Sequence, residues 1–326
     1  MRILTPDPGL SGIIAAQRYL DVHPHARLAI LEKDADIGGV FSRREPPSAV
    51  SSVQINLTNM IGRNYDAFWT QWTVGLSEFS DMPMQRPPED DCRHDFYRAK
   101  WTTHYLEQYV DRKNDEGRTL RGVIRFGMDV ENIKKIGTSW EISCKDSEGS
   151  AQTFHASKLM VASGLNTTPN MPRFLGAEDF KGPIIHSIDF GAQEHTILHS
   201  STIQNITIIG GGKSAADMLY EALQAGKTVS WIIRTTGAGA PFFAPGKGQV
   251  GYKNAFELGS TRIVASINPS TLHSRNWWTS FLHGTTIGAA LLKRIIATMD
   301  KEIRGVADYQ GRESDKGFEK LEYNTP

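Results

Sequence analysis

Two glycine-rich turns are the parts of this sequence whose residue types and spacing could support chemistry. Gly9 and Gly12 belong to the first turn, and Gly210 and Gly212 belong to the second. Glycines at such spacing permit a sharp bend and let the backbone approach a pyrophosphate, which then lies at the N-terminus of the next helix. The two turns therefore predict binding of phosphate-bearing cofactors.

The first turn departs from the G-x-G-x-x-G pattern in one place. Gly9 and Gly12 match the second and third glycines, whereas Asp7 occupies the position of the first. A carboxylate at that position repels a pyrophosphate. Glu32 lies about twenty residues after Gly12, where an acid accepts hydrogen bonds from ribose hydroxyls. We expect this unit to bind a dinucleotide, and an ordinary βαβ unit with a surface glutamate is the alternative.

The second turn follows the pattern more closely. Gly210 and Gly212 are followed by Ser214 and by Ala215, which stands where the last small residue belongs. Arg234 ends the next predicted strand, and a cation there suits the 2′-phosphate of NADPH, whereas an acid would suit NADH. We therefore expect NADPH at this turn, with a surface arginine as the alternative for Arg234.

Each turn needs a strand and a helix to position it, and the flanking sequence predicts both. The apolar patterns give a helix over 13–20, a strand over 27–32, a strand over 206–209, a helix over 214–225 and a strand over 228–234. The pair Gly38 and Gly39 follows the first unit directly. This internal repeat predicts an α/β fold with two Rossmann-like domains, the second inserted into the first.

Length and composition limit the function further. A chain of 326 residues is long enough for two domains. Lysine plus arginine equals aspartate plus glutamate, at 36 each, so no basic surplus favours nucleic acid. Two cysteines and ten histidines without ligand spacing predict no metal site. Without an apolar leader or a long apolar run, we expect a cytoplasmic protein that acts on a small substrate.

Three further segments resemble those of a known family. Residues 180–190, FKGPIIHSIDF, match the pattern F-x-G-x-x-x-H-x-x-x-(F/Y/W), residues 79–84 are FSDMPM, and residues 162–164 are ASG. Together they resemble segments of the class B flavin-dependent monooxygenases, which include the flavin-containing monooxygenases. These matches cover most of residues 9–234.

The resemblance implies FAD at the first turn and NADPH at the second. His186 matches the family histidine that helps to hold NADP in place. NADPH would reduce FAD, and a C4a-hydroperoxyflavin formed with O2 would insert one oxygen atom into a small organic substrate. Enzymes of this family often tailor small natural products, so the resemblance also implies a role in secondary-metabolite biosynthesis.

The family also uses an amide side chain beside the flavin, and two residues could supply it. Spacing from the FSDMPM segment favours Gln71, whereas Asn59 belongs to a literal Thr-Asn dipeptide. Phe190 at the end of the histidine motif is typical of the N- or S-hydroxylating enzymes, and Baeyer–Villiger chemistry remains open. Trp277 and Trp278 could line a pocket for a planar substrate or pack in a core.

The resemblance implies an FAD-binding domain over 1–170, with an irregular insert at 43–64, and an NADP-binding domain with a C-terminal extension over 171–326. No obvious copy of the strand that completes the FAD domain in the family follows, so we expect that domain to be incomplete. A truncated, non-catalytic remnant or nucleotide-binding protein is therefore an alternative. A pyridine-nucleotide disulfide reductase ranks below it, because Cys92 and Cys144 form no C-x-x-C pair.

Overall fold

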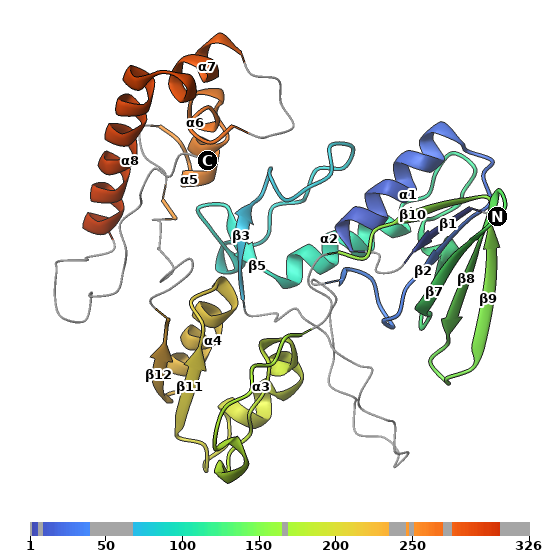
Figure 1. The fold of residues 1–326 in the computed structure, drawn as a ribbon, viewed down its shortest axis with the longest axis horizontal. Coiled ribbons are helices and arrows are strands. Elements are labelled where there is room, and N and C mark those ends of the chain that lie inside the picture. Colours follow the sequence, from blue (N-terminus) through green and yellow to red (C-terminus); the bar gives the residue numbers. More distant parts are fainter. Residues whose placement is uncertain are drawn as a thin grey trace. The chain divides into compact units, whose positions relative to one another are not determined.

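A computed structural model describes residues 2–5, 9–39, 68–164, 169–234, 246–247, 251–269 and 276–306. The chain divides into two compact units (Figure 1). The first unit comprises Met1–Thr70, Ser77–Pro87 and Arg98–Ser200, and the second comprises Gln71–Leu76, Pro88–Tyr97 and Ser201–Pro326. Residues 171–200 thus lie in the first unit, although the sequence prediction counted them with the NADP-binding domain.

A parallel sheet of four strands forms the centre of the first unit. Its strands run in the order β10-β1-β2-β6, with bounds Lys158–Val161, Arg2–Thr5, Leu28–Leu31 and Ile124–Arg125. Helix α1 (Leu10–Val22) connects β1 to β2, and α2 (Lys100–Asp111) precedes β6. With β1 in the middle and the chain winding outward on both sides, this is a Rossmann-type order, which confirms the predicted α/β class.

Helix α1 packs on the sheet through its small and apolar residues. Gly12, Ile13 and Ala16 are buried, and the helix contacts β1 and β2. All four residues of β2 are buried, as expected for a parallel strand covered on both faces. The helix predicted over 13–20 and the strand predicted over 27–32 are therefore both confirmed.

An antiparallel meander covers the opposite side of this sheet (Figure 1). It consists of β7 (Asp129–Ile136), β8 (Ser139–Lys145) and β9 (Ala151–Ala156). Ile142 and Cys144 of β8 join Ala29 and Leu31 of β2 in one apolar cluster. Burial raises the pKa of the Cys144 thiol, so this cysteine is a core residue with little thiolate character.

The first unit ends in short helices that contain the histidine motif. After β10 come η5 (Ala177–Asp179), η6 (Ser187–Asp189) and α3 (Phe190–Leu198). Another short helix, η4 (Arg121–Val123), lies earlier in the chain, directly before β6. Phe190, Ile197 and Leu198 bury the inner face of α3.

A small sheet with the order β3-β5-β4 has most of its residues in the second unit. Its strands are Trp69–Thr73, Phe96–Arg98 and Cys92–Arg93, and η3 (Glu89–Asp91) precedes β4. The hairpin between β4 and β5 turns at His94 and Asp95, which both have positive φ, as two-residue hairpin turns require.

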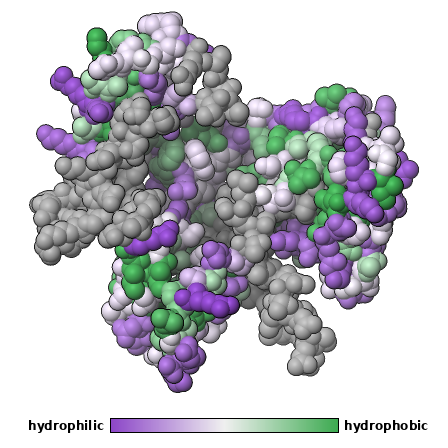
Figure 2. All heavy atoms as spheres, viewed as in Figure 1, coloured by the Kyte–Doolittle hydropathy of each residue, from purple (hydrophilic) through white to green (hydrophobic). Residues whose placement is uncertain are grey.

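The second glycine turn lies in a βαβ unit of the second unit. β11 (Asn205–Ile209) and β12 (Thr228–Ile232) pair in parallel, and α4 (Lys213–Gln224) connects them. Figure 2 shows hydrophobic residues gathered on the visible surface over this unit. Ile209 and Ile232 are 57% and 52% exposed, and Tyr220 and Leu223 are also exposed. Parallel strands are normally covered on both faces, so this exposed apolar surface is unusual for such a pair.

Four helices follow in the second unit: α5 (Ala255–Gly259), α6 (Arg262–Ala265), α7 (Trp277–Gly284) and α8 (Thr286–Val306). A capping box between Asn276 and Thr279 begins α7. The Trp278 indole N–H donates to Ser266 Oγ at 3.0 Å, whereas Trp277 is 79% exposed. Trp278 therefore packs within the helical region, as the core alternative predicted for it. Among the described residues, no helix is long and apolar enough to cross a membrane.

Gly288 of α8 lies close against the backbone of α7. A Cβ atom at this position would lie 2.1 Å from the Phe281 carbonyl oxygen and 2.6 Å from that of Leu282. Both neighbours are backbone atoms, which cannot rotate away as a side chain would. Any residue other than glycine therefore forces the two helices apart.

We expect Gly288→Ala to lower the free energy of unfolding by at least the upper end of the roughly 1–3 kcal/mol typical of overpacking. Gly284→Ala is the matched control, because nothing lies within 4 Å of a Cβ there. Urea unfolding followed by tryptophan fluorescence measures both variants. Equal stability of the two variants would contradict the close approach of α7 and α8.

Candidate functional site

The first glycine turn faces the crevice where the parallel sheet changes winding direction. β1 lies between β10 and β2, and the register places Thr5 beside Val161 at the carboxyl ends of β1 and β10. Ligands of open α/β sheets bind at this edge. Val161 is 63% exposed, and Gly164, with φ of 73°, has open space around its Cβ position. The edge is thus accessible where the ASG segment ends β10.

The amino end of α1 supplies the phosphate-binding geometry at this edge. Gly9 is the N-cap residue, no side-chain hydrogen bond caps it, and the first turn contains no acidic residue. The backbone N–H groups of the first helical turn therefore point to the crevice and favour an anion. Buried Gly12 keeps this helix close to the sheet. Asp7, which departs from the glycine pattern, lies outside the described residues.

Glu32 lies directly after β2, at the same edge of the sheet. Its side chain is fully buried, and its Oε1 accepts a hydrogen bond from the Asp34 N–H at 2.7 Å. Its backbone N–H donates to the Arg125 carbonyl, and its own carbonyl accepts from the Met128 N–H. The alternative of a surface glutamate is therefore wrong, since Glu32 is a buried acid fixed at the strand end.

The glycine pair after Glu32 forms a turn that only glycine adopts readily. Gly38 has φ of 112° and Gly39 has φ of 57°, and both residues are buried. The chain thereby folds back close to the end of β2. This placement agrees with a role for the pair in backbone approach to a ligand, which stays a prediction.

The second glycine turn has the same features in the second unit. Gly210 has φ of 125°, and its N–H donates to the Ile232 carbonyl at 2.9 Å. Gly212 is the N-cap residue of α4, which starts without an acidic residue in its first turn. The space where Cβ atoms of Gly210 and Gly212 would lie is empty to 4 Å. Ser214 is exposed in the first turn, and Ala215 is buried behind it.

Two charged groups flank this turn. Arg234 is exposed two residues after the end of β12, at the carboxyl edge where the sequence predicts a 2′-phosphate contact. Lys213 forms an ion pair with Asp217 one turn along α4. Burial raises the pKa of Asp217, even though the neighbouring ammonium opposes that shift. The charge of Lys213 is thus compensated by Asp217, so this pair adds no net positive charge at the helix start.

Local contacts explain several of the residue types in the histidine motif. The Phe180 ring lies where a Cβ of Gly182 would be, at 2.8 Å from its Cε1 atom. His186 Nδ1 accepts the Ile188 N–H at 3.2 Å, which caps η6. Neutral His186 must then have its proton on Nε2, where it can donate to another acceptor. Phe190 is buried and stacks on Phe68, with ring centroids 6.5 Å apart.

Only one of the two amide candidates is described. Gln71 lies exposed on β3, whereas Asn59 lies outside the described residues. The aromatic residues around Gln71 are engaged in packing: Arg98 stacks over the Trp69 ring at 4.6 Å, and Trp72 lies 5.2 Å from the Phe256 ring. The choice between Gln71 and Asn59 stays open.

The FSDMPM segment is held by a cluster that the sequence did not reveal. Asp81 Oδ1 pairs with Arg18 of α1 at 2.9 Å, and Oδ2 pairs with Arg112 at 2.6 Å. The Tyr109 hydroxyl donates to the same carboxylate at 3.1 Å, and Arg112 also donates to the Asp81 carbonyl. Asp81 thus joins α1, α2 and its own turn. These pairings could not be seen in the sequence, because the partners lie far from Asp81 along the chain.

Electrostatics keeps this carboxylate ionised. Burial would raise the pKa of Asp81, but the hydrogen bonds from Arg112 and Tyr109 outweigh burial and hold that pKa below its ordinary value. Burial and the hydrogen bond to Asp81 raise the pKa of Tyr109, and burial raises the pKa of Tyr105. Both tyrosines therefore stay neutral hydrogen-bond donors at physiological pH.

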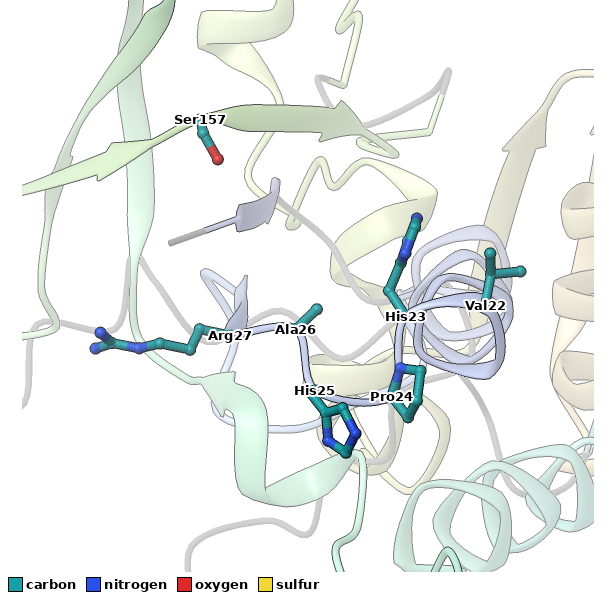
Figure 3. A pocket seen from close by; sticks show the side chains of 7 residues that line it. All are labelled: Val22, His23, Pro24, His25, Ala26, Arg27 and Ser157. Carbon is teal, nitrogen blue, oxygen red and sulfur yellow. The ribbon is translucent and has the colours of Figure 1, made fainter.

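A surface cavity of the first unit lies elsewhere. About 520 Å³ in volume, it is lined by residues 22–27 and Ser157. These residues precede β2 and β10, so the cavity lies at the amino ends of the strands, opposite the glycine turn. In Figure 3, the side chains of His23, His25 and Arg27 diverge rather than converge on one point. Within the described part of the chain, no cluster of three or more His, Cys, Asp or Glu residues could hold a metal.

Comparison with known proteins gives this geometry a context. A family model described as L-lysine 6-monooxygenase/L-ornithine 5-monooxygenase matches residues 94–240. An FAD-dependent monooxygenase from Pyrenophora dematioidea is 30% identical over 294 residues, which cover 86% of this chain and 48% of that protein. The chain thus spans about half the length of the curated relatives it matches.

Two solved structures are similar in fold. S-allyl-L-cysteine S-oxygenase from Allium sativum has a TM-score of 0.55 at 19% identity, over 78% of this chain and 54% of that chain. Bacillithiol disulfide reductase from Bacillus cereus has a TM-score of 0.50 at 14% identity, over 81% of this chain and 64% of that chain. At these identities the likeness shows the fold alone, and oxygenases and a reductase share it.

The Asp81 cluster predicts a specific dependence of stability on pH. Because the pKa of Asp81 is depressed in the folded state, its contribution is present above the unfolded value of about 3.9 and is lost as pH falls through the folded value. Asp81→Asn should lower the free energy of unfolding by about 2 kcal/mol at pH 7. The gap to the original protein should narrow as pH falls below about 4.

Urea unfolding between pH 7 and pH 3 measures this gap. Asp21→Asn is the control, because it changes only exposed contacts within α1, an ion pair with Arg18 and a hydrogen bond from Gln17, which are worth little. A gap between Asp81→Asn and the original protein that stays constant with pH would contradict an ionised, hydrogen-bonded Asp81.

Proposed function

We propose that this chain, which is similar to FAD-dependent monooxygenases, binds FAD and NADPH and inserts one oxygen atom from O2 into a small organic substrate. The observation that carries the proposal is the uncapped amino end of α1, which faces the β1–β10 crevice with buried Glu32 at the neighbouring strand end. Bound FAD would supply the redox and oxygen chemistry, which no protein side chain provides.

The residues at the first edge fit FAD in their chemistry. The N–H groups after Gly9 would hold the pyrophosphate, with Gly12 keeping the helix close. Glu32 would accept hydrogen bonds from the ribose hydroxyls, and its fixed backbone keeps the carboxylate in place. The turn at Gly38 and Gly39 would let the main chain approach the cofactor.

The residues at the second turn fit NADPH. The N–H groups after Gly210 and Gly212, with the Ser214 hydroxyl, would hold the phosphates, and Arg234 would pair with the 2′-phosphate. The Nε2–H of His186 would donate to the bound nucleotide. We further propose that an FAD-binding domain over 1–170 surrounds the insert at 43–64 and that the NADP-binding domain occupies 171–326.

The proposed substrate is defined only as a class, a small organic molecule. An amide near the flavin, either Gln71 or Asn59, would position the reacting oxygen by a hydrogen bond. The relatives named FAD-dependent monooxygenase come from fungi, including Pyrenophora and Aspergillus, which supports a role in tailoring small natural products. A cytoplasmic location remains a prediction from the composition.

Two other functions remain as alternatives. A non-catalytic remnant or nucleotide-binding protein is favoured by the exposed apolar residues of β11, β12 and α4, because a complete domain would cover them. A disulfide reductase needs a reactive cysteine pair. Cys92 and Cys144 are buried thiols on different strands, which argues against that reaction.

The first test is visible absorption of the purified chain before and after anaerobic NADPH. We expect a flavin spectrum that bleaches on reduction, and reoxidation by air should restore it. Colourless, folded protein that takes up no added FAD would reject the monooxygenase proposal and favour the remnant. A flavin spectrum that NADPH does not bleach would retain FAD binding and reject the NADPH site.

The cofactor preference gives a second test. Arg234→Ala should raise the KM for NADPH about 10-fold or more in the flavin-reduction assay and leave the KM for NADH nearly unchanged, since only NADPH has the 2′-phosphate. Arg262→Ala is the control, because Arg262 is also an exposed arginine of the second unit. Equal effects of Arg234→Ala on both cofactors would reject the assigned contact.

A further inference from the structure

We propose that Asp81 and Arg18 are positioning residues that couple nucleotide binding at the amino end of α1 to the conformation of the 79–84 turn. The contact between Arg18 and Asp81 is a property of the fold, whereas its link to a nucleotide rests on the proposed function. Asp81 would act through Arg18 and the turn, without touching the reacting atoms.

The 79–84 turn is a small, well-connected unit in the first unit of the chain. The Phe79 N–H donates to the Tyr105 hydroxyl at 2.7 Å, and that hydroxyl donates to the Met82 carbonyl at 2.7 Å. The Met84 N–H donates to Glu78 Oε2 at 2.9 Å. The Phe79 ring lies 4.5 Å from the Tyr109 ring, centroid to centroid. The backbone of this turn thus depends on α2.

Arg18 extends this unit to the nucleotide-binding helix. Its guanidinium bridges two carboxylates, with Nη1 on Asp21 at 2.8 Å and Nη2 on Asp81 at 2.9 Å. Gln17 also donates to Asp21, which holds that carboxylate in place on α1. Because a helix moves as a rigid element, a shift of its amino end on binding a phosphate is transmitted to Arg18. The turn must follow, or the ion pair must break.

The charge of Asp81 is needed for this coupling. A carboxylate has room for about four hydrogen bonds on its two oxygens. Arg18 occupies one side, Arg112 the other, and Tyr109 donates to both oxygens. An asparagine at this position would place its NH2 group against one of the two guanidinium groups, so the contact with that arginine would be lost. The side chain is 23% exposed, so water replaces these contacts only in part.

The fold part of the proposal is tested by hydrogen exchange on the protein without flavin. Arg18→Gln should speed exchange of the Phe79, Met82 and Met84 amides about fivefold or more, because the turn opens more often. Asp21→Asn is the matched control, since it removes the other partner of Arg18 and leaves the turn contact. Equal exchange in the two variants would overturn the proposal.

Arg18→Lys guards against a variant that fails to fold. Lysine keeps the charge but offers a single point contact, so exchange should fall between the rates of the original protein and Arg18→Gln. A turn that opens as fast in Arg18→Lys as in Arg18→Gln would contradict an ion pair as the cause.

The nucleotide part is tested by FAD titration followed by flavin fluorescence. Coupling is reciprocal, so Arg18→Gln should raise the Kd for FAD, and FAD should protect the turn less in this variant than in the original protein. An unchanged Kd would overturn the coupling while leaving FAD binding intact. If neither the original protein nor any variant binds FAD, the proposed function is rejected. The hydrogen-exchange experiment without flavin would then still show whether the Arg18–Asp81 ion pair stabilises the turn.

Discussion

The ionised carboxylate of Asp81 is the contact on which the arrangement of the first unit depends. It receives Arg18 from α1, and Arg112 and Tyr109 from α2 and its end, while its own backbone forms the 79–84 turn. Burying such a charge would be unfavourable without partners, and its partners are charged or neutral donors that match its lone pairs. The helix that starts at the first glycine turn is therefore held at its far end by a tertiary ion pair.

The second constraint is the edge of the parallel sheet. Its order places β1 between β10 and β2, so the glycine turn, Glu32 and the end of β10 meet at one edge without any single residue being reactive. The cavity lined by residues 22–27 and Ser157 lies at the other edge, where its polar side chains diverge. Backbone N–H groups and one buried acid thus define the candidate site better than a cavity does.

Local features were predictable from the sequence, because helix periodicity, glycine turns and strand ends depend on neighbouring residues. The helix after Gly9, the strand before Glu32 and the second βαβ unit were all found in this way. The Asp81 cluster was not, since its partners in α2 lie up to 31 positions away and pair only after folding. His186 was recognised by its motif, yet its hydrogen bond to the Ile188 N–H needed coordinates. Helices α5 to α8 were also missed, and for the tryptophan pair of α7 the sequence favoured core packing only slightly over a pocket.

Shared architecture does not by itself choose between oxygenation and thiol chemistry, since a reductase and an oxygenase match this fold similarly. The choice depends on side chains that the fold leaves free to vary. Cys144 is buried in an apolar cluster, where burial raises its pKa and disfavours the thiolate that disulfide exchange requires. Cys92 and Cys144 lie on different strands, so the two cysteines of this chain are poor candidates for the dithiol that a disulfide reductase uses.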